Sequence, residues 1–154
     1  LFRSMLSTAR SHGLDEKYDL TLEATHHGPL LRSPALYIAI GSTIEQWGDS
    51  EAADVWAQVI SHKLGLSGHQ AVEWQAGGDG MIGLGGCHYA PRQKAVLSES
   101  ELWVGHILAN YALPFELPEG DSTPAGAWRH SLEASVRPTR DTIPAANLFA
   151  HLDR

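Results

Sequence analysis

The sequence predicts an α/β fold built as a single domain, residues 1–154, with a mixed or mostly parallel sheet flanked by helices. Strand-like and helix-like segments alternate along the chain, one apolar run is typical of a strand buried on both faces, and one segment carries a clear helical stripe. The chain has 154 residues, 43% of them hydrophobic and 19% charged, which suits one soluble globular domain with a core. In such folds ligands bind at the carboxyl ends of the strands.

Three segments are predicted to be neighbouring strands. Residues Tyr18–Ala24 alternate between polar and apolar, and Ala35–Ile40 form the near-continuous apolar run. Residues Gly80–Gly86 form a glycine-rich strand. Residues 102–108 are either another strand or a buried turn.

The helices are predicted from apolar spacing and from residues that favour helix ends. Residues 1–11 have near-helical spacing and end before Gly13. A helix over 50–64, capped by Asp49 or Ser50 and stopped by Gly65, is expected to cover one face of the sheet. Its stripe is expected to bury Trp56 and Ile60.

The last third of the chain predicts one helix and an irregular tail. Trp128, Leu132 and Val136 fall on one helical face. From Pro138 onward the sequence is loop-like, with a short helix near 145–152.

Composition excludes several classes of protein. No run of 18 apolar residues predicts a membrane span, and a net charge of −7 argues against broad contact with nucleic-acid phosphates. The single cysteine, Cys87, excludes an internal disulfide and suits a reducing compartment, so we expect a cytoplasmic protein with Cys87 as a small buried side chain.

Residues 78–83 match the dinucleotide-binding pattern G-x-G-x-x-G, but no helix is predicted to begin there. We therefore expect a strand that a neighbouring segment or a ligand approaches closely.

Two histidine-containing motifs are the strongest functional signals. Residues 25–29 read Thr-His-His-Gly-Pro, and residues 85–92 read Gly-Gly-Cys-His-Tyr-Ala-Pro-Arg. Histidine titrates near neutral pH and is the commonest metal ligand, so His26, His27 and His88 are the predicted catalytic residues. On an extended backbone only one of His26 and His27 would face the site. The alternative is that each histidine caps a turn.

Other residues near these motifs are candidates for binding substrate. Backbone N–H groups at glycines can stabilise an oxyanion, and a Gly-Ser-Thr turn after a buried strand can hold a phosphate or ribose, or be an ordinary turn. The predicted substrate-binding residues are Gly28, Gly41, Ser42, Thr43, Gly85, Gly86, Tyr89 and Arg92. Arg92 would pair with a phosphate, or with a carboxylate such as Glu45 or Glu99.

Four blocks of the sequence together resemble a known family. Residues 23–29, 40–47 and 85–92, with 105–108 followed by 111–113, are similar in order and interval to the archaeal and plant-type D-aminoacyl-tRNA deacylases. The resemblance extends from about residue 18 to about residue 113. Family members are longer, so we expect this chain to be a carboxyl-terminal portion that lacks an amino-terminal part.

The resemblance implies hydrolysis of the ester that joins a D-amino acid to the 3′ end of tRNA, in translation quality control and D-amino acid metabolism. It implies a fold similar to peptidyl-tRNA hydrolase and phosphorylase-like proteins. The implied partner is tRNA carrying a D-amino acid, and no membrane partner is expected.

The resemblance also implies zinc as a cofactor. Catalytic zinc takes three protein ligands and leaves a place for water. The candidate nitrogen ligands are His26, His27, His88 and His106, and Glu23 is a candidate oxygen ligand. If Glu23 does not bind the metal, it would orient a histidine or be solvated. The remaining histidines are expected at the surface: His12, His62, His69, His130 and His151.

Two other functions compete with deacylation. One is a related α/β hydrolase or phosphorylase-like enzyme acting on a nucleoside or a peptidyl-tRNA ester. The other is a non-catalytic tRNA-binding relative, which the acidic charge favours. A basic face around Arg32, Arg92 and Lys94 would favour the functions that involve tRNA.

Overall fold

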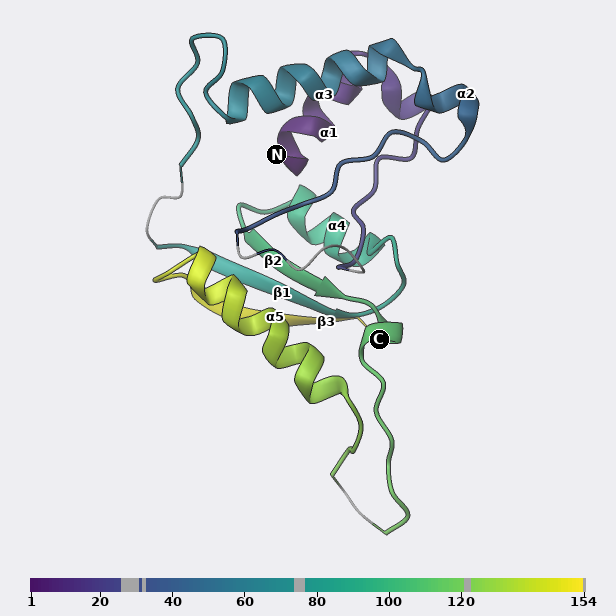
Figure 1. Cartoon of the computed structure of the whole chain (residues 1–154), viewed down its shortest axis with the longest axis vertical. Helices are drawn as coiled ribbons and strands as arrows, with labels where there is room; N and C mark the ends of the chain where they lie inside the picture. Colours follow the sequence, from purple (N-terminus) through teal and green to yellow (C-terminus); the bar gives the residue numbers. More distant parts are fainter. Residues whose placement is uncertain (26–30, 32, 74–76, 121–122, 154) are drawn as a thin grey trace. The chain divides into compact units, whose positions relative to one another are not determined.

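The computed structural model describes residues 1–25, 31, 33–73, 77–120 and 123–153 (Figure 1). They form two compact units. The helical unit comprises Leu1–Leu20 and Ala35–Trp74, and the sheet unit comprises Thr21–Pro34 and Gln75–Arg154. The prediction of a single domain stays a prediction.

The helical unit is built on two packed helices. Its elements are α1 (Phe2–Ser11), the short 3₁₀ helix η1 (Leu14–Glu16), α2 (Ile44–Trp47) and α3 (Ser50–Lys63). Buried apolar side chains of α1 and α3 form its core: Met5, Leu6, Ala9, Leu14, Ala52, Val55 and Val59. The predicted helices at 1–11 and 50–64 are confirmed to within one residue at each end.

The start of α3 is fixed by Asp49, as predicted. Its Oδ1 accepts hydrogen bonds from the backbone N–H groups of Glu51 and Ala52, at 3.0 and 3.2 Å. Its Oδ2 accepts from Lys17 Nζ at 2.5 Å and from Tyr18 Oη at 2.6 Å. The hydrogen bond from Lys17, then those from Tyr18 and the helix backbone, hold the pKa of Asp49 far below its usual range.

The buried face of α3 differs from the predicted one. Trp56 and Ile60 are half-buried, whereas Val55 and Val59 are buried against α1. The apolar face of α3 is broad, and packing against one helix buries only the residues in the middle of that face. Gly65, with φ +69°, follows the end of the helix as predicted.

The sheet unit confirms the α/β fold class. Its elements are β1 (Asp79–Gly85), α4 (Pro91–Ser98), β2 (Trp103–Leu108), η2 (Asn110–Ala112), α5 (Trp128–Thr142) and β3 (Asn147–Asp153). The strands pair in the order β2-β1-β3, and both pairs are parallel. Figure 1 shows α4 and α5 on opposite sides of this sheet.

Glycines in the strands allow the helices to pack closely. A Cβ at Gly83 would lie 2.9 Å from Gln93 Cγ of α4, whereas a Cβ at Gly105 would overlap the Thr139 side chain of α5. A Cβ at Gly80 would lie 2.6 Å from Ile143 Cδ1. The glycine-rich segment is therefore a strand that neighbours approach closely, as predicted, and not a dinucleotide loop.

The predicted neighbours of β1 were wrong. Residues 18–24 and 35–40 form no strand, and β2 and β3 flank β1 instead. The side chains of Leu36, Tyr37 and Ile38 are exposed. An apolar run predicts a buried strand only where a partner strand completes the hydrogen-bond ladder, and the described residues supply none there.

The predicted tail after Pro138 was also wrong. Helix α5 continues through Pro138 to Thr142, and residues 147–153 form β3 rather than a helix. Tertiary packing supports α5 beyond the proline, because Thr139 and Ile143 are buried. In the described ranges of the chain, no helix is both long and apolar enough to cross a bilayer.

Candidate functional site

The candidate site lies in the sheet unit, where the three parallel strands end at one edge. Gly85 ends β1 and Gly86 follows it, with φ +92° and +75°, and a Cβ at either residue would overlap Asp153 at the end of β3. The backbone N–H of Asn110, just beyond β2, donates to Gly86 O at 3.0 Å. These contacts bring the ends of all three strands together.

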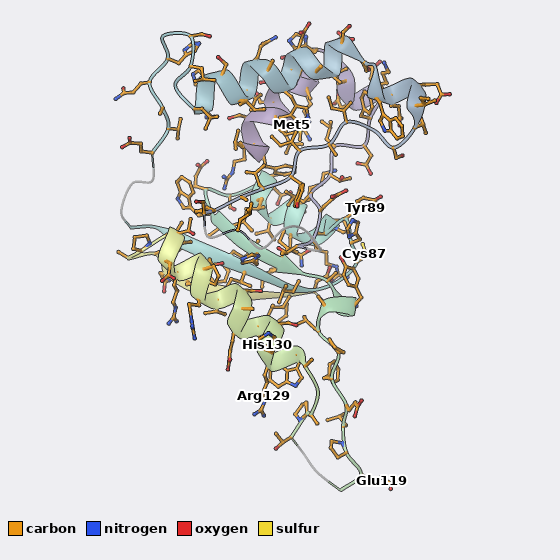
Figure 2. The ribbon with its side chains drawn as sticks, in the orientation of Figure 1. Met5, Cys87, Tyr89, Glu119, Arg129 and His130 are labelled. Atoms are coloured by element: carbon orange, nitrogen blue, oxygen red, sulfur yellow. The ribbon has the colours of Figure 1, made fainter. Side chains whose placement is uncertain are left out.

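His88 lies on the turn that follows β1. Its Nδ1 is 2.9 Å from Tyr111 Oη, and its Nε2 is 3.8 Å from Glu23 Oε1. The ring also contacts Tyr89, with centroids 5.1 Å apart. Figure 2 shows Cys87 and Tyr89 on this turn. The geometry is that of an imidazole held on one nitrogen by a phenol, with a carboxylate facing the other nitrogen.

Glu23 reaches His88 because the segment of residues 21–25 is hydrogen-bonded to the turn after β1 and to β2. Ala24 N–H donates to His88 O at 2.7 Å, and Thr25 N–H donates to Ile107 O at 2.6 Å. The side chain of Ala24 is buried in a small core with Ala90 and Ile107. Of the interpretations open for Glu23, the contact favours orientation of a histidine.

His106 lies near the end of β2 and is half-buried. Its Nδ1 is 3.1 Å from Thr25 Oγ1. Burial lowers the pKa of His106, so the ring is neutral at neutral pH.

Arg92 is the second residue of α4 and lies beside the carboxyl ends of the strands. Its Nε is 3.1 Å from Asp153 Oδ1, so its partner is Asp153 rather than Glu45 or Glu99. The Arg92 side chain remains 67% exposed while that of Asp153 is 7% exposed. A buried carboxylate thus orients a guanidinium whose surface is open to solvent.

The structure brings part of the predicted site together. His88, Glu23, Gly85, Gly86 and Arg92 meet at the strand ends of the sheet unit, and Tyr89 is exposed beside them. His26, His27 and Gly28 lie outside the described residues, as do Pro29 and Arg32.

The predicted Gly-Ser-Thr turn belongs to the helical unit. The backbone N–H groups of Ser42 and Thr43 both donate to Gln46 Oε1, at 2.8 and 3.1 Å. Gly41 has φ +57°, which suits a tight turn. Because Gln46 already uses these donors, the contacts favour the interpretation as an ordinary turn.

Sequence reasoning missed several features of the site. Tyr111 and Asp153 were not predicted as site residues. The signal for Tyr111 was its place just after the block at 105–108. A correct assignment of β3 would have placed Asp153 at a strand end. Cys87 is exposed rather than buried, because the turn at Gly85 and Gly86 takes the chain out of the sheet. His151 is half-buried with its Nδ1 buried, whereas the other four histidines expected at the surface are exposed.

The described side chains around His88 are too few to form a metal site. The described part of the chain contains no group of three His, Cys, Asp or Glu side chains placed to hold a metal ion. His88 and Glu23 adjoin, but His106 is bonded to Thr25, so the described residues do not make a zinc site by themselves. Zinc stays a prediction from the resemblance.

Comparison with known proteins agrees with the sequence blocks. A family model described as D-aminoacyl-tRNA deacylase matches residues 1–142. A D-aminoacyl-tRNA deacylase from Arabidopsis thaliana is 38% identical over 162 aligned positions, covering 99% of this chain and 51% of that protein. One from Methanosarcina barkeri is 44% identical over 112 positions, covering 72% of this chain and 33% of that protein. The chain thus spans about half or less of the length of these relatives, and it belongs to the D-aminoacyl-tRNA deacylase family.

Proposed function

We propose that this chain hydrolyses the ester joining a D-amino acid to the 3′ end of tRNA, releasing the free D-amino acid and the tRNA. Family membership supports the reaction, and the histidine at the strand ends supplies a group able to move the protons. A cytoplasmic location, where charged tRNA is used in translation, is part of this proposal.

His88 is proposed to transfer the protons. It takes a proton from water as the water oxygen adds to the ester carbonyl. It then gives that proton to the ribose oxygen as the ester C–O bond breaks, leaving a carboxylic acid, which ionises, and a ribose hydroxyl. The Tyr111 hydroxyl orients the ring through Nδ1, and the Glu23 carboxylate favours the imidazolium that forms transiently.

Neighbouring groups are proposed to bind the rest of the substrate. The chain turns at Gly85 and Gly86 beside His88, and the N–H of the half-buried Gly86 is proposed to approach the developing oxyanion. Arg92, held by Asp153, presents donors to a phosphate of the tRNA terminus. Tyr89 offers an exposed ring for contact with the terminal base.

The observation that carries the proposal is the set of His88, Tyr111 and Glu23 at the carboxyl edge of the sheet. The test uses one tRNA charged with the D- or the L-form of the same amino acid and measures the amino acid released by the 154-residue chain. Release from the D-form above the uncatalysed rate, with much slower release from the L-form, supports it. Binding of both forms without release would identify a non-catalytic tRNA-binding relative and overturn it.

Zinc enters this proposal only as an expectation from the resemblance, and no step above depends on it. Metal analysis before and after dialysis against a chelator tests it on the purified chain. Stoichiometric zinc that is lost together with activity would support a zinc site. Full activity in zinc-free protein would contradict it.

A further inference from the structure

The two edges of the sheet differ in what covers them. At one edge, β2 is covered near its end, because Thr25 N–H donates to Ile107 O at 2.6 Å and Thr25 Oγ1 accepts from Ile107 N–H at 3.2 Å. At the other edge, β3 pairs with β1 alone (Figure 1). Within the described ranges, no segment is hydrogen-bonded along the outer side of β3. This side of β3 is therefore an open sheet edge.

The direction of the main-chain groups of β3 follows from one hydrogen bond. Asn147 N–H donates to Gly78 O at 2.9 Å, so the main-chain groups of Asn147 point towards β1. Because these groups alternate in direction along a strand, those of Leu148, Ala150 and Leu152 point outward. In the part of the chain that the structure describes, these outward N–H and C=O groups have no hydrogen-bond partner. The partner that fits such a row of donors and acceptors is another strand.

The sequence of β3 does not protect this edge against pairing. Proteins usually protect an edge strand with proline, lysine or a bulge. Residues 147–153 read Asn-Leu-Phe-Ala-His-Leu-Asp and pair with β1 in unbroken register. The acidic side chain of Asp153 is already paired with Arg92, and Leu152 is 63% exposed. The strand is thus uninterrupted, apolar at its surface and open to a further strand.

The position of Ala150 makes the edge complementary to itself. Ala150 is the middle residue of β3 (Asn147–Asp153), and its main-chain groups point outward. An antiparallel pairing of two copies about a two-fold axis at Ala150 places Ala150 opposite the same residue of the second copy. It also places Leu148 opposite Leu152, so all the outward N–H and C=O groups of both strands find partners.

The same register places compatible side chains opposite each other. The two leucines of one copy meet those of the other, and Phe149, which is 39% exposed, lies opposite His151. Asp153 lies opposite Asn147, so like charges do not face each other across the axis.

We propose that β3 pairs antiparallel with β3 of a second copy of this chain, centred on Ala150. The sheet then continues through both copies in the order β2-β1-β3-β3-β1-β2. The two-fold axis is perpendicular to the sheet, so α5 of both copies lies on one side and α4 of both on the other. The contact is confined to one strand of each copy, and small interfaces are weak, so the dimer forms at high protein concentration. The proposal does not depend on the proposed function.

Sedimentation of the 154-residue chain, from micromolar to near-millimolar concentration, tests the assembly. We expect monomer and dimer in an equilibrium that shifts with concentration. Ala150→Pro removes an outward N–H without removing a bond to β1, and Leu152→Lys adds a charge beside the axis, so both variants should remain monomeric. A native chain that stays monomeric, or a dimer that persists in both variants, would overturn the proposal.

Disulfide formation tests the register, in chains that carry Cys87→Ser because Cys87 is exposed. Across the axis the two Cα atoms of residue 150 would be about 5.5 Å apart, which a disulfide can bridge. We expect Ala150→Cys to form a covalent dimer on mild oxidation. Leu152→Cys is the matched control, because its two copies would be more than about 13 Å apart. Equal cross-linking of both variants, or none in Ala150→Cys, would overturn the register.

Amide hydrogen exchange identifies the hydrogen bonds themselves. As concentration rises, exchange at Leu148, Ala150 and Leu152 should slow in proportion to the fraction of dimer, because their N–H groups gain partners. Exchange at Phe149 and His151, whose N–H groups already point towards β1, should change much less. A dimer whose outward amides exchange as fast as those of the monomer would overturn the proposal.

Discussion

At the scale of single residues, the environment of His88 is made by groups that are distant in sequence. Glu23 comes from the segment of residues 21–25 and Tyr111 from η2, and both contact the His88 ring on the turn after β1. Glu23 and His88 have side chains 40% and 35% exposed, so solvent screens their attraction. The Tyr111 hydrogen bond is therefore the stronger constraint on the orientation of the ring.

We predict that Tyr111→Phe lowers the deacylation rate by roughly tenfold or more, because the ring of His88 loses the hydrogen bond that orients it. Phenylalanine keeps the aromatic packing, so the melting temperature should hardly change. Single-turnover deacylation and thermal unfolding are measured on the same preparation. An unchanged rate would remove Tyr111 from the site.

At the scale of elements, glycines decide how closely α5 packs on the sheet. Gly105 on β2 faces Thr139 of α5, and a Cβ there would overlap that side chain. The overlap is with a β-branched residue whose hydroxyl donates to the Ser135 carbonyl within the helix, so it has little freedom to move aside.

We predict that Gly105→Ala destabilises the chain by about 1–3 kcal/mol through overpacking. The double variant Gly105→Ala/Thr139→Ala should regain part of this loss, because the second change removes the atoms that clash. Gly48→Ala is the control, since a Cβ there meets nothing within 4 Å. Additive effects of the two substitutions in denaturant unfolding would contradict this packing.

The start of α3 gives a pH prediction. Asp49 has a pKa lowered by Lys17, Tyr18 and the helix backbone, so its contribution to stability is complete above the unfolded-state pKa, about 3.9. It is lost as pH falls below that value towards the folded-state pKa. Asp49→Asn keeps a capping oxygen but loses the charge. Its melting temperature should therefore be lower than that of the native chain at pH 7, with the difference shrinking in acid. A constant difference down to strongly acidic pH would refute the assignment.

The sequence predicted the elements whose signals are local. Asp49 caps the start of α3 and Gly65 follows its end, so capping chemistry predicted both ends of this helix. The predicted glycine-rich strand agrees with β1 to within one residue at each end. Strand pairing is not local, so the apolar run at 35–40 suggested a central strand although the neighbours of β1 are β2 and β3. His88 was found by its motif, whereas Tyr111 and Asp153 join the site only through the topology of the sheet.

At the scale of the whole molecule, the acidic charge restricts how the chain would bind the tRNA of the proposed function. A net charge of −7 disfavours wide contact with phosphates, so the proposed recognition would depend on few local contacts such as Arg92. We predict that tRNA affinity falls by roughly tenfold or less between 50 and 200 mM salt, as about two phosphate contacts would give. Equilibrium binding over this range measures it. A thousandfold loss would indicate an extensive basic surface and contradict the prediction.

The central claim is that this chain performs hydrolysis at the turn after β1, with His88 moving the protons. The direct test is single-turnover deacylation of D-aminoacyl-tRNA by the native chain and by His88→Ala, with the melting temperature of both measured in the same buffer. The account predicts a rate lower by roughly 10²–10⁴-fold at a similar melting temperature, because the side chain is at the surface edge of the sheet and outside the buried core. A His88→Ala chain that melts earlier but deacylates at the native rate per folded molecule would contradict it.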